Sequence, residues 1–161
     1  MKNVYVVCVF LLLMSCSYTF KSVRFQNVKN IHIAQVVNKT KDYNLPQIFT
    51  EAITRVFQID NNFTVVREES VADAVLSVTI LDYARQTMST DSQGSATSFK
   101  ITLTVSYSFR RVKEDEMLDE STSYPYEQVY SFDKNVSDDT LKIDIVKKMT
   151  EELKSLIVEG F

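Results

Sequence analysis

The sequence is poor in residues that break or cross-link a chain: its 161 residues include two glycines, two prolines, two cysteines and no tryptophan. So little glycine and proline excludes a collagen-like chain and a proline-rich or linker-rich disordered one. Two cysteines cannot build a disulfide framework, and a formal net charge of −3 gives no electrostatic footprint for nucleic acid. A single histidine, His32, leaves few options for acid–base catalysis. We therefore expect one folded domain that is not an enzyme and holds no cofactor or metal.

The first sixteen residues have the pattern of an export signal. Lys2 supplies a positive start, and eleven uncharged residues from Val4 to Met14 follow. At ~1.5 Å per helical residue this run covers roughly half of a ~30 Å hydrocarbon core, so it is too short to span a membrane and has the length of a secretory leader. Leu13-Met14-Ser15-Cys16 then resembles a bacterial lipobox, in which the cysteine is acylated and becomes the new N-terminus. The alternative is an ordinary signal peptide with a chance cysteine near its cleavage site.

The lipobox interpretation predicts that residues 1–15 are removed and that residues 16–161 form a single domain anchored through Cys16. Cys8 would leave with the leader, so the mature protein would carry no free thiol. Loss of Lys2 would leave 17 basic against 21 acidic residues, a net charge of −4. Each buried CH₂ contributes ~0.8 kcal/mol, so two or three acyl chains would make a practically permanent anchor.

Hydrophobic spacing predicts two amphipathic helices. The first is expected to begin at Asn44, which can cap it, with Pro46 tolerated in its first turn. The second is expected from Ser137 to Gly160, with Asp138 and Asp139 favourable at its positive N-terminal end. In both helices apolar residues recur three or four positions apart and form one broad stripe for packing. The stripes consist of Ile48, Phe49, Ala52, Ile53, Val56 and Phe57, and of Ile145, Val146, Met149, Leu153, Leu156 and Ile157.

Alternating and β-branched runs predict the strands. The clearest is 99–110, where apolar and polar residues alternate strictly, which predicts one buried face and one solvent-exposed face. Segments 87–97 and 111–124 are expected to be solvated tips. The other strands are expected at 30–37, 63–67, 74–86 and 126–132. This β-α-β-β-β-β-α order predicts an α+β fold in which two helices pack on one face of a mostly antiparallel sheet of four to five strands.

Several short motifs occur in an order that one known family shares. They are the opening Cys16-Ser17-Tyr18-Thr19-Phe20, the helix motif Phe49-x-x-Ala52, Ala72-Asp73-Ala74 before a strand, the alternating strand from Phe99, and the closing helix through Ile145-Val146 to Ile157. Together with the lipobox they resemble the LptE family of lipopolysaccharide-assembly lipoproteins. The resemblance covers nearly the whole mature chain.

This resemblance implies a lipoprotein anchored on the periplasmic side of the cell outer membrane. It implies that the protein plugs and helps assemble the LptD β-barrel, and that it assists the transport and insertion of lipopolysaccharide. The expected partners are therefore an LptD-type barrel, lipopolysaccharide and the outer membrane. The residues leave open two alternatives, namely another outer-membrane lipoprotein that acts as a glycan- or protein-binding module, and an unrecognised hydrolase.

In better-known members of the LptE family, basic residues near the central hairpin and the start of the last helix contact the glycolipid. In this sequence those stretches read Ser89-Thr90-Asp91-Ser92 and Asp138-Asp139-Thr140. Both are acidic or neutral, so the resemblance assigns no glycolipid-binding residue to them.

Basic side chains are the candidate ligands for a phosphorylated lipid. Lys100 and Arg110 lie on the wet face of the long strand, Arg111 is beside them, and Arg85 lies near the end of the expected hairpin partner. Arginine suits bidentate phosphate contact, and lysine supplies a point charge. The alternative is that these residues only solubilise an exposed sheet face.

Other polar residues give no catalytic or metal-binding pattern. No nucleophile motif accompanies His32, so we expect it to be structural or exposed. Glu114-Asp115-Glu116 lacks the ligand spacing and the glycine of a calcium loop, and indicates a charged tip. The pairs Glu68-Glu69 and Glu151-Glu152 point in different directions within each pair and indicate surface charge. Aromatic residues around the last strand fit an interface as well as the core, namely Tyr124, Tyr126 and Tyr130.

Overall fold

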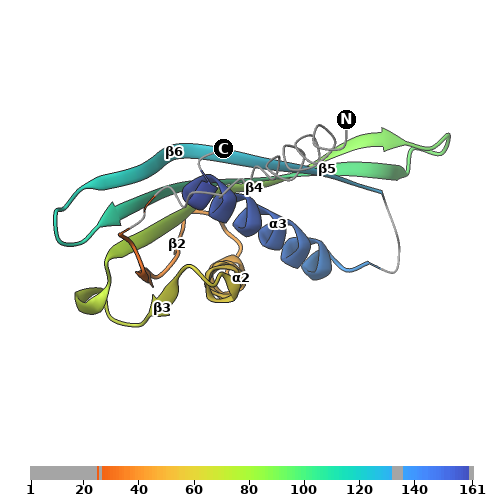
Figure 1. The fold of residues 1–161 in the computed structure, drawn as a ribbon. Helices are drawn as coiled ribbons and strands as arrows, with labels where there is room; N and C mark the ends of the chain where they lie inside the picture. Colours follow the sequence, from red (N-terminus) through yellow and green to blue (C-terminus); the bar gives the residue numbers. More distant parts are fainter. Residues whose placement is uncertain (1–24, 26, 132–135, 160–161) are drawn as a thin grey trace, which may run out of the picture.

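The computed structural model describes residues 25, 27–131 and 136–159, so the predicted leader and the predicted lipidation site, Cys16, lie outside the described residues. A mixed sheet forms one layer and two helices form the other (Figure 1). In chain order the elements are β1 (Asn30–Ile33), β2 (Val37–Asn38), α2 (Leu45–Ile59), β3 (Thr64–Val66), the 3₁₀ turn η1 (Glu69–Val71), β4 (Ala74–Thr90), β5 (Ala96–Arg111), β6 (Met117–Ser131) and α3 (Asp138–Glu159). Within the described residues, no helix has the length and apolar character of a membrane span.

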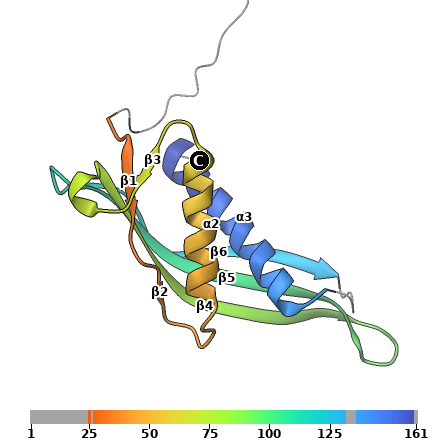
Figure 2. The same cartoon turned by 90° about the horizontal axis from the view of Figure 1, so that it is seen from below.

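The α+β prediction is confirmed, including both helices on one face of the sheet (Figure 2). The long strands β4, β5 and β6 pair antiparallel in sequence order. The short strands supply the parallel part of this mostly antiparallel sheet, because β1 pairs parallel with both β3 and β4, and β2 pairs parallel with β4. Segment 30–37 is therefore two strands, not one. Helix α2 provides the crossover that a parallel β1–β3 pair requires.

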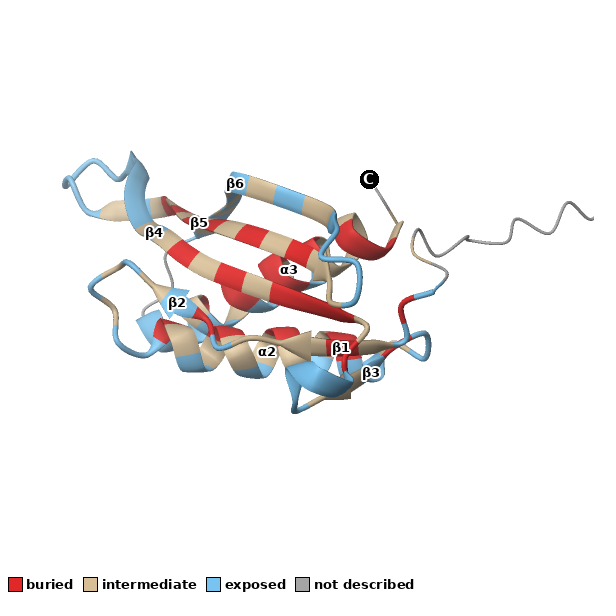
Figure 3. Cartoon of the chain, turned by 90° about the vertical axis from the view of Figure 1, so that its left-hand side faces the viewer, coloured by how far each residue is buried: buried red, intermediate tan, exposed pale blue. Residues whose placement is uncertain are grey.

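The loops predicted at 87–97 and 111–124 are mostly strand, which corrects those two predictions. The turn between β4 and β5 occupies only residues 91–95, where Gly94 adopts a φ of +79°. β6 already begins at Met117. At its far end, β4 extends beyond the helices and is exposed on both faces (Figure 3). In a strand that is exposed to solvent on both faces, apolar and polar residues do not alternate, so its composition is like that of a loop.

Both helices begin where the sequence predicts, although only one has the expected cap. The Ser137 hydroxyl accepts a hydrogen bond from the Thr140 N–H at 3.2 Å, which caps α3. Asn44 precedes α2 but makes no side-chain cap bond, and Pro46 lies in the first turn as expected. Ion pairs join the two helix starts and the two helix ends: Lys142 Nζ lies 2.6 Å from Asp42 Oδ2, and Lys154 Nζ lies 2.6 Å from Asp60 Oδ2. The two helices therefore run in the same direction.

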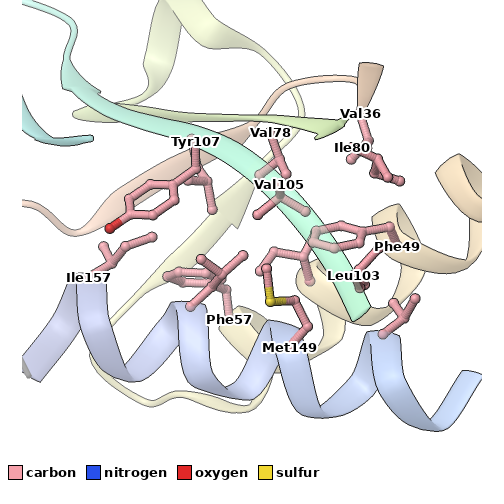
Figure 4. Close-up of a cluster of buried hydrophobic side chains, with 14 of the residues drawn as sticks. Val36, Phe49, Phe57, Val78, Ile80, Leu103, Val105, Tyr107, Met149 and Ile157 are labelled. Atoms are coloured by element: carbon pink, nitrogen blue, oxygen red, sulfur yellow. The ribbon is translucent and has the colours of Figure 1, made fainter. Parts of the chain in front are cut away.

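The core fills the space between the helices and the alternating face of the sheet. Figure 4 shows Phe49 and Phe57 from α2, Met149 from α3, and Leu103 and Val105 from β5 meeting there. Every apolar residue of the predicted β5 alternation is buried, while the hydroxyl residues between them stay half-exposed. This one-sided burial determines which basic residues of the sheet face the helices.

Candidate functional site

Arg85 lies on the helix-covered face of the sheet, because a bulge between Ile80 and Asp82 shifts the alternation of β4 by one residue. Ile80 pairs with the buried Val105 before the bulge, and Arg85 pairs with the buried Ile101 after it. The guanidinium lies 3.7 Å from the centroid of the Phe99 ring. Its Nη1 donates to Asp138 Oδ1 at 2.7 Å, in the first turn of α3.

A pocket of about 520 Å³ opens at this point, between β4–β6 and the start of α3. Phe99 and Tyr130 stack in it with ring centroids 5.9 Å apart, and Leu141 adds to the apolar lining. Arg85, Asp138 and Asp144 supply charge. An apolar pocket with a few charged groups suits an amphiphile, in which a polar group lies next to hydrocarbon.

Two tyrosine hydroxyls of β6 hold α3 against the sheet. Tyr130 donates to Asp144 Oδ2 at 2.8 Å, and Tyr124 donates to Glu152. Burial, together with the bond to Glu152, raises the pKa of Tyr124 to about 12. The same two causes, with Asp144 as partner, raise the pKa of Tyr130. Both phenols are therefore neutral donors at neutral pH. Tyr124, Tyr126 and Tyr130 are all partly buried against the core.

Asp144 stays charged beside the pocket. Burial alone would raise the pKa of this carboxyl, but hydrogen bonds from Lys148 and Tyr130 outweigh that effect and lower the pKa. Lys148 Nζ lies 2.9 Å from Asp144 Oδ2 and 5.6 Å from the centroid of the Tyr130 ring. The carboxylate is therefore compensated by a cation and adds little net negative charge to the pocket.

The other predicted basic residues lie away from this pocket. Lys100 and Arg110 are on the open face of β5, ten positions and so about 33 Å apart. Lys100 Nζ pairs with Glu127 Oε1 at 2.9 Å. Arg110 pairs with Asp115 at 2.6 Å and with Glu69 at 3.2 Å. These two cations are therefore separate points on the open face.

Arg111 points to the opposite face from Arg110, because it is the next residue along the strand. Its Nε lies 3.8 Å from carboxylate oxygens of both Glu114 and Glu116. That Nε is buried and has no hydrogen-bond partner in the described part of the chain. The structure thus distributes the four predicted basic residues over two faces and does not assemble them into one patch.

The remaining candidates have structural contacts. His32 is half-buried between β3 and β4, with Nδ1 3.3 Å from the Val66 carbonyl oxygen. The acidic residues of the tip 114–116 form ion pairs with Arg110 and Arg111, and Glu69 also pairs with Arg110. Glu152 accepts a hydrogen bond from the Tyr124 hydroxyl. Across residues 25, 27–131 and 136–159, no three His, Cys, Asp or Glu side chains gather as metal ligands.

Sequence reasoning missed two parts of this end of the molecule. Asp138 is the ion-pair partner of Arg85, a contact between residues 53 positions apart that no local pattern indicates. Segment 39–43, which follows β2, is mostly polar and contains no motif that would connect it with this end of the molecule. The structure places it beside Tyr83 and the start of α3, where Asp42 meets Lys142.

The solved structures that share this arrangement come from bacteria and are distant in sequence. The hypothetical protein CT253 from Chlamydia trachomatis is 10% identical with a TM-score of 0.56, and the match covers 81% of this chain and 98% of that one. The protein XCC0632 from Xanthomonas campestris is 9% identical with a TM-score of 0.55, over 80% of this chain and 82% of that one. An uncharacterized lipoprotein B from Nitrosomonas europaea is 10% identical with a TM-score of 0.50, over 84% and 88%. At such low identity these likenesses show the fold alone.

The family comparison goes further. Residues 28–159 match the family described as "LptE: Lipopolysaccharide-assembly", whereas no curated protein matches the chain. The match covers nearly all of the described domain. The chain belongs to the LptE family of lipopolysaccharide-assembly proteins, as its motifs indicated. That family is non-enzymatic.

Proposed function

We propose that this protein is an outer-membrane lipoprotein that occupies the lumen of an LptD-type β-barrel and assists the transport and insertion of lipopolysaccharide. The family match over residues 28–159 carries the proposal. The two-layer fold supports it, because a domain that has its own buried core can keep its structure inside the lumen of a barrel. The lipobox supports the membrane anchor, with acylation at Cys16 and the domain on the periplasmic side.

Direct contact with the glycolipid is part of the proposal, and Arg85 is its first candidate. An ion pair as exposed as Arg85–Asp138 contributes only about 0–1 kcal/mol, so a phosphate can replace the carboxylate at little cost. Phe99, Tyr130 and Leu141 then offer apolar surface to the hydrocarbon part of the same ligand. Arg85 also lies next to the start of α3, because it is bonded to Asp138.

Lys100, Arg110 and Arg111 keep the same proposed role as separate contacts. Each would exchange a carboxylate partner for a phosphate. Because they lie far apart or on opposite faces, we expect their single substitutions to act independently.

Co-purification from membranes tests the main proposal. The full-length protein with a C-terminal tag is solubilised in mild detergent and purified, and we expect a very large β-barrel protein to co-elute. Depletion of the protein should also lower the lipopolysaccharide on the cell surface. A stable monomer without a barrel partner would contradict the proposal and favour the glycan- or protein-binding lipoprotein. Turnover of a substrate would favour the hydrolase.

Labelling with a radioactive fatty acid tests the anchor. The wild-type protein should incorporate the label after loss of residues 1–15, and Cys16→Ser should abolish both steps. The control is Cys8→Ser, which changes the other cysteine and should leave labelling intact. Label on the Cys16→Ser protein would contradict the proposed anchor site.

A further inference from the structure

Tyr43 is an aromatic residue held almost entirely in solvent. Its side chain is in the segment between β2 and α2, and 93% of its surface is exposed. Tyrosine combines a large apolar ring with a polar hydroxyl, and it is enriched where proteins contact a ligand or a partner. Such exposure needs an explanation when the rest of the segment is well ordered.

Hydrogen bonds fix the segment that carries Tyr43. Asn38 Nδ2 donates to the Asp42 carbonyl at 2.8 Å, and Asn38 Oδ1 accepts the Thr40 N–H at 3.0 Å. The Thr40 hydroxyl accepts the Asp42 N–H at 3.2 Å, and Asp42 Oδ1 accepts the Asn44 N–H at 3.1 Å. A backbone that is already ordered loses little conformational entropy when a ligand binds.

The charges of the segment favour an anion. Lys41 is exposed, and none of the described carboxylates lies within ion-pair distance of it. Asp42 is the one acid of segment 39–44, and Lys142 compensates it at 2.6 Å. The hydrogen bond from Lys142 is also the main reason that the pKa of Asp42 is lowered. The cation of Lys41 therefore remains uncompensated.

A shallow hollow of about 500 Å³ brings these groups together. Its lining includes Lys41, Tyr43 and Tyr83. Tyr83 is two residues before Arg85 and on the same face of β4, about 7 Å away along the strand. The hollow therefore lies next to the Arg85 pocket, and one extended ligand can contact both.

We propose that Lys41 and Tyr43 form a second contact for a phosphorylated saccharide, in which Lys41 binds a phosphate and the Tyr43 ring packs on a sugar. A lysine supplies a point charge that tolerates varied phosphate geometry. The face of a sugar ring carries C–H groups, which an exposed aromatic ring covers. This assignment rests on the proposed glycolipid function and extends the Arg85 pocket to residues on another element.

Photo-crosslinking in cells tests this contact. Tyr43 is replaced by p-benzoylphenylalanine in the full-length protein, and adducts are identified by blotting and mass spectrometry. The control probe replaces Val71, which is also exposed (57%) but lies in η1, outside both pockets. We expect a glycolipid adduct at position 43 and none at position 71.

A charge-reversal pair tests the role of Lys41. Combined with the probe at position 43, Lys41→Glu should lower the glycolipid adduct about fivefold or more, since one basic charge near a lipid phosphate is lost. Lys39→Glu is the matched control, because Lys39 is an exposed lysine of the same segment that does not line the hollow. An equal loss in both variants would overturn the site.

The identity of the adduct decides the remaining alternatives. An adduct with a protein alone, with a phospholipid that lacks sugar, or no adduct at all would overturn the proposal. Each strain is also checked for the co-eluting barrel. A barrel that co-elutes without a glycolipid adduct at position 43 removes only this contact. If no barrel co-elutes with the wild-type protein, the proposed function itself is contradicted.

Discussion

Substituting two neighbouring residues of β5 tests the one-sided burial of the sheet. Leu103 is fully buried and faces the helices, whereas Thr104 is half-exposed on the open face. Leu103→Ala removes buried methyl and methylene groups and leaves a cavity in the interior, which costs about 3 kcal/mol in comparable sites. Because a domain of this size has a free energy of unfolding of about 5–15 kcal/mol, this is a large loss. Thr104→Ala creates no cavity and should cost less than about 1 kcal/mol.

Urea unfolding of the mature protein in detergent, followed by circular dichroism, measures this difference. With an m-value of about 2 kcal/mol/M, Leu103→Ala should lower the urea midpoint by about 1.5 M, and Thr104→Ala by less than about 0.5 M. Equal shifts, or a larger shift for Thr104→Ala, would refute the assignment of the two faces. A changed m-value would indicate that the substitution alters the compactness of the unfolded or the folded state. The unfolding would then be followed with a second spectroscopic probe as well.

Three further predictions concern the site, the helix starts and the hairpin. Arg85→Ala should lower binding of purified lipopolysaccharide in a pull-down about tenfold, and Arg85→Lys less, whereas equal binding by all three proteins would remove Arg85 from the site. The pKa of Asp42 is lowered in the folded protein, so the stability it contributes is present above its ordinary value of 3.8 and is lost as pH falls through the folded value. Asp42→Asn should therefore lower the urea midpoint at about pH 7 and match the wild type at about pH 2. Gly94 has a φ of +79° with open space around it, so Gly94→Ala should cost about 1 kcal/mol of backbone strain and accelerate amide exchange at residues 90–96 but not at Leu103.

Residue patterns predict the parts of this fold in which burial alternates. The β5 alternation identified the covered face, and the stripes of α2 and α3 identified the surfaces that pack on it. The parallel pairing of β1 was not predictable, because strands of two to four residues carry no signal of direction or partner. The far end of β4 was missed because neither of its faces there meets the core.

The candidate site shows the same limit. Arg85 was identified as a possible phosphate ligand, but its face could not be predicted from the sequence. The bulge after Ile80 reverses the alternation, and only this reversal turns Arg85 toward Phe99 and Asp138. Tyr43 was missed because a polar connecting segment gives no sign that its aromatic residue stays exposed.

The length of the hairpin strands has a consequence for the proposed location. β5 has 16 residues, which at ~3.3 Å per residue gives a rod of about 53 Å, and the hydrocarbon layer of a bilayer measures only ~30 Å. A rod of this size, standing upright in a pore through that layer, would reach from one aqueous compartment to the other. One rigid element could then touch the same cargo molecule where it enters and where it leaves.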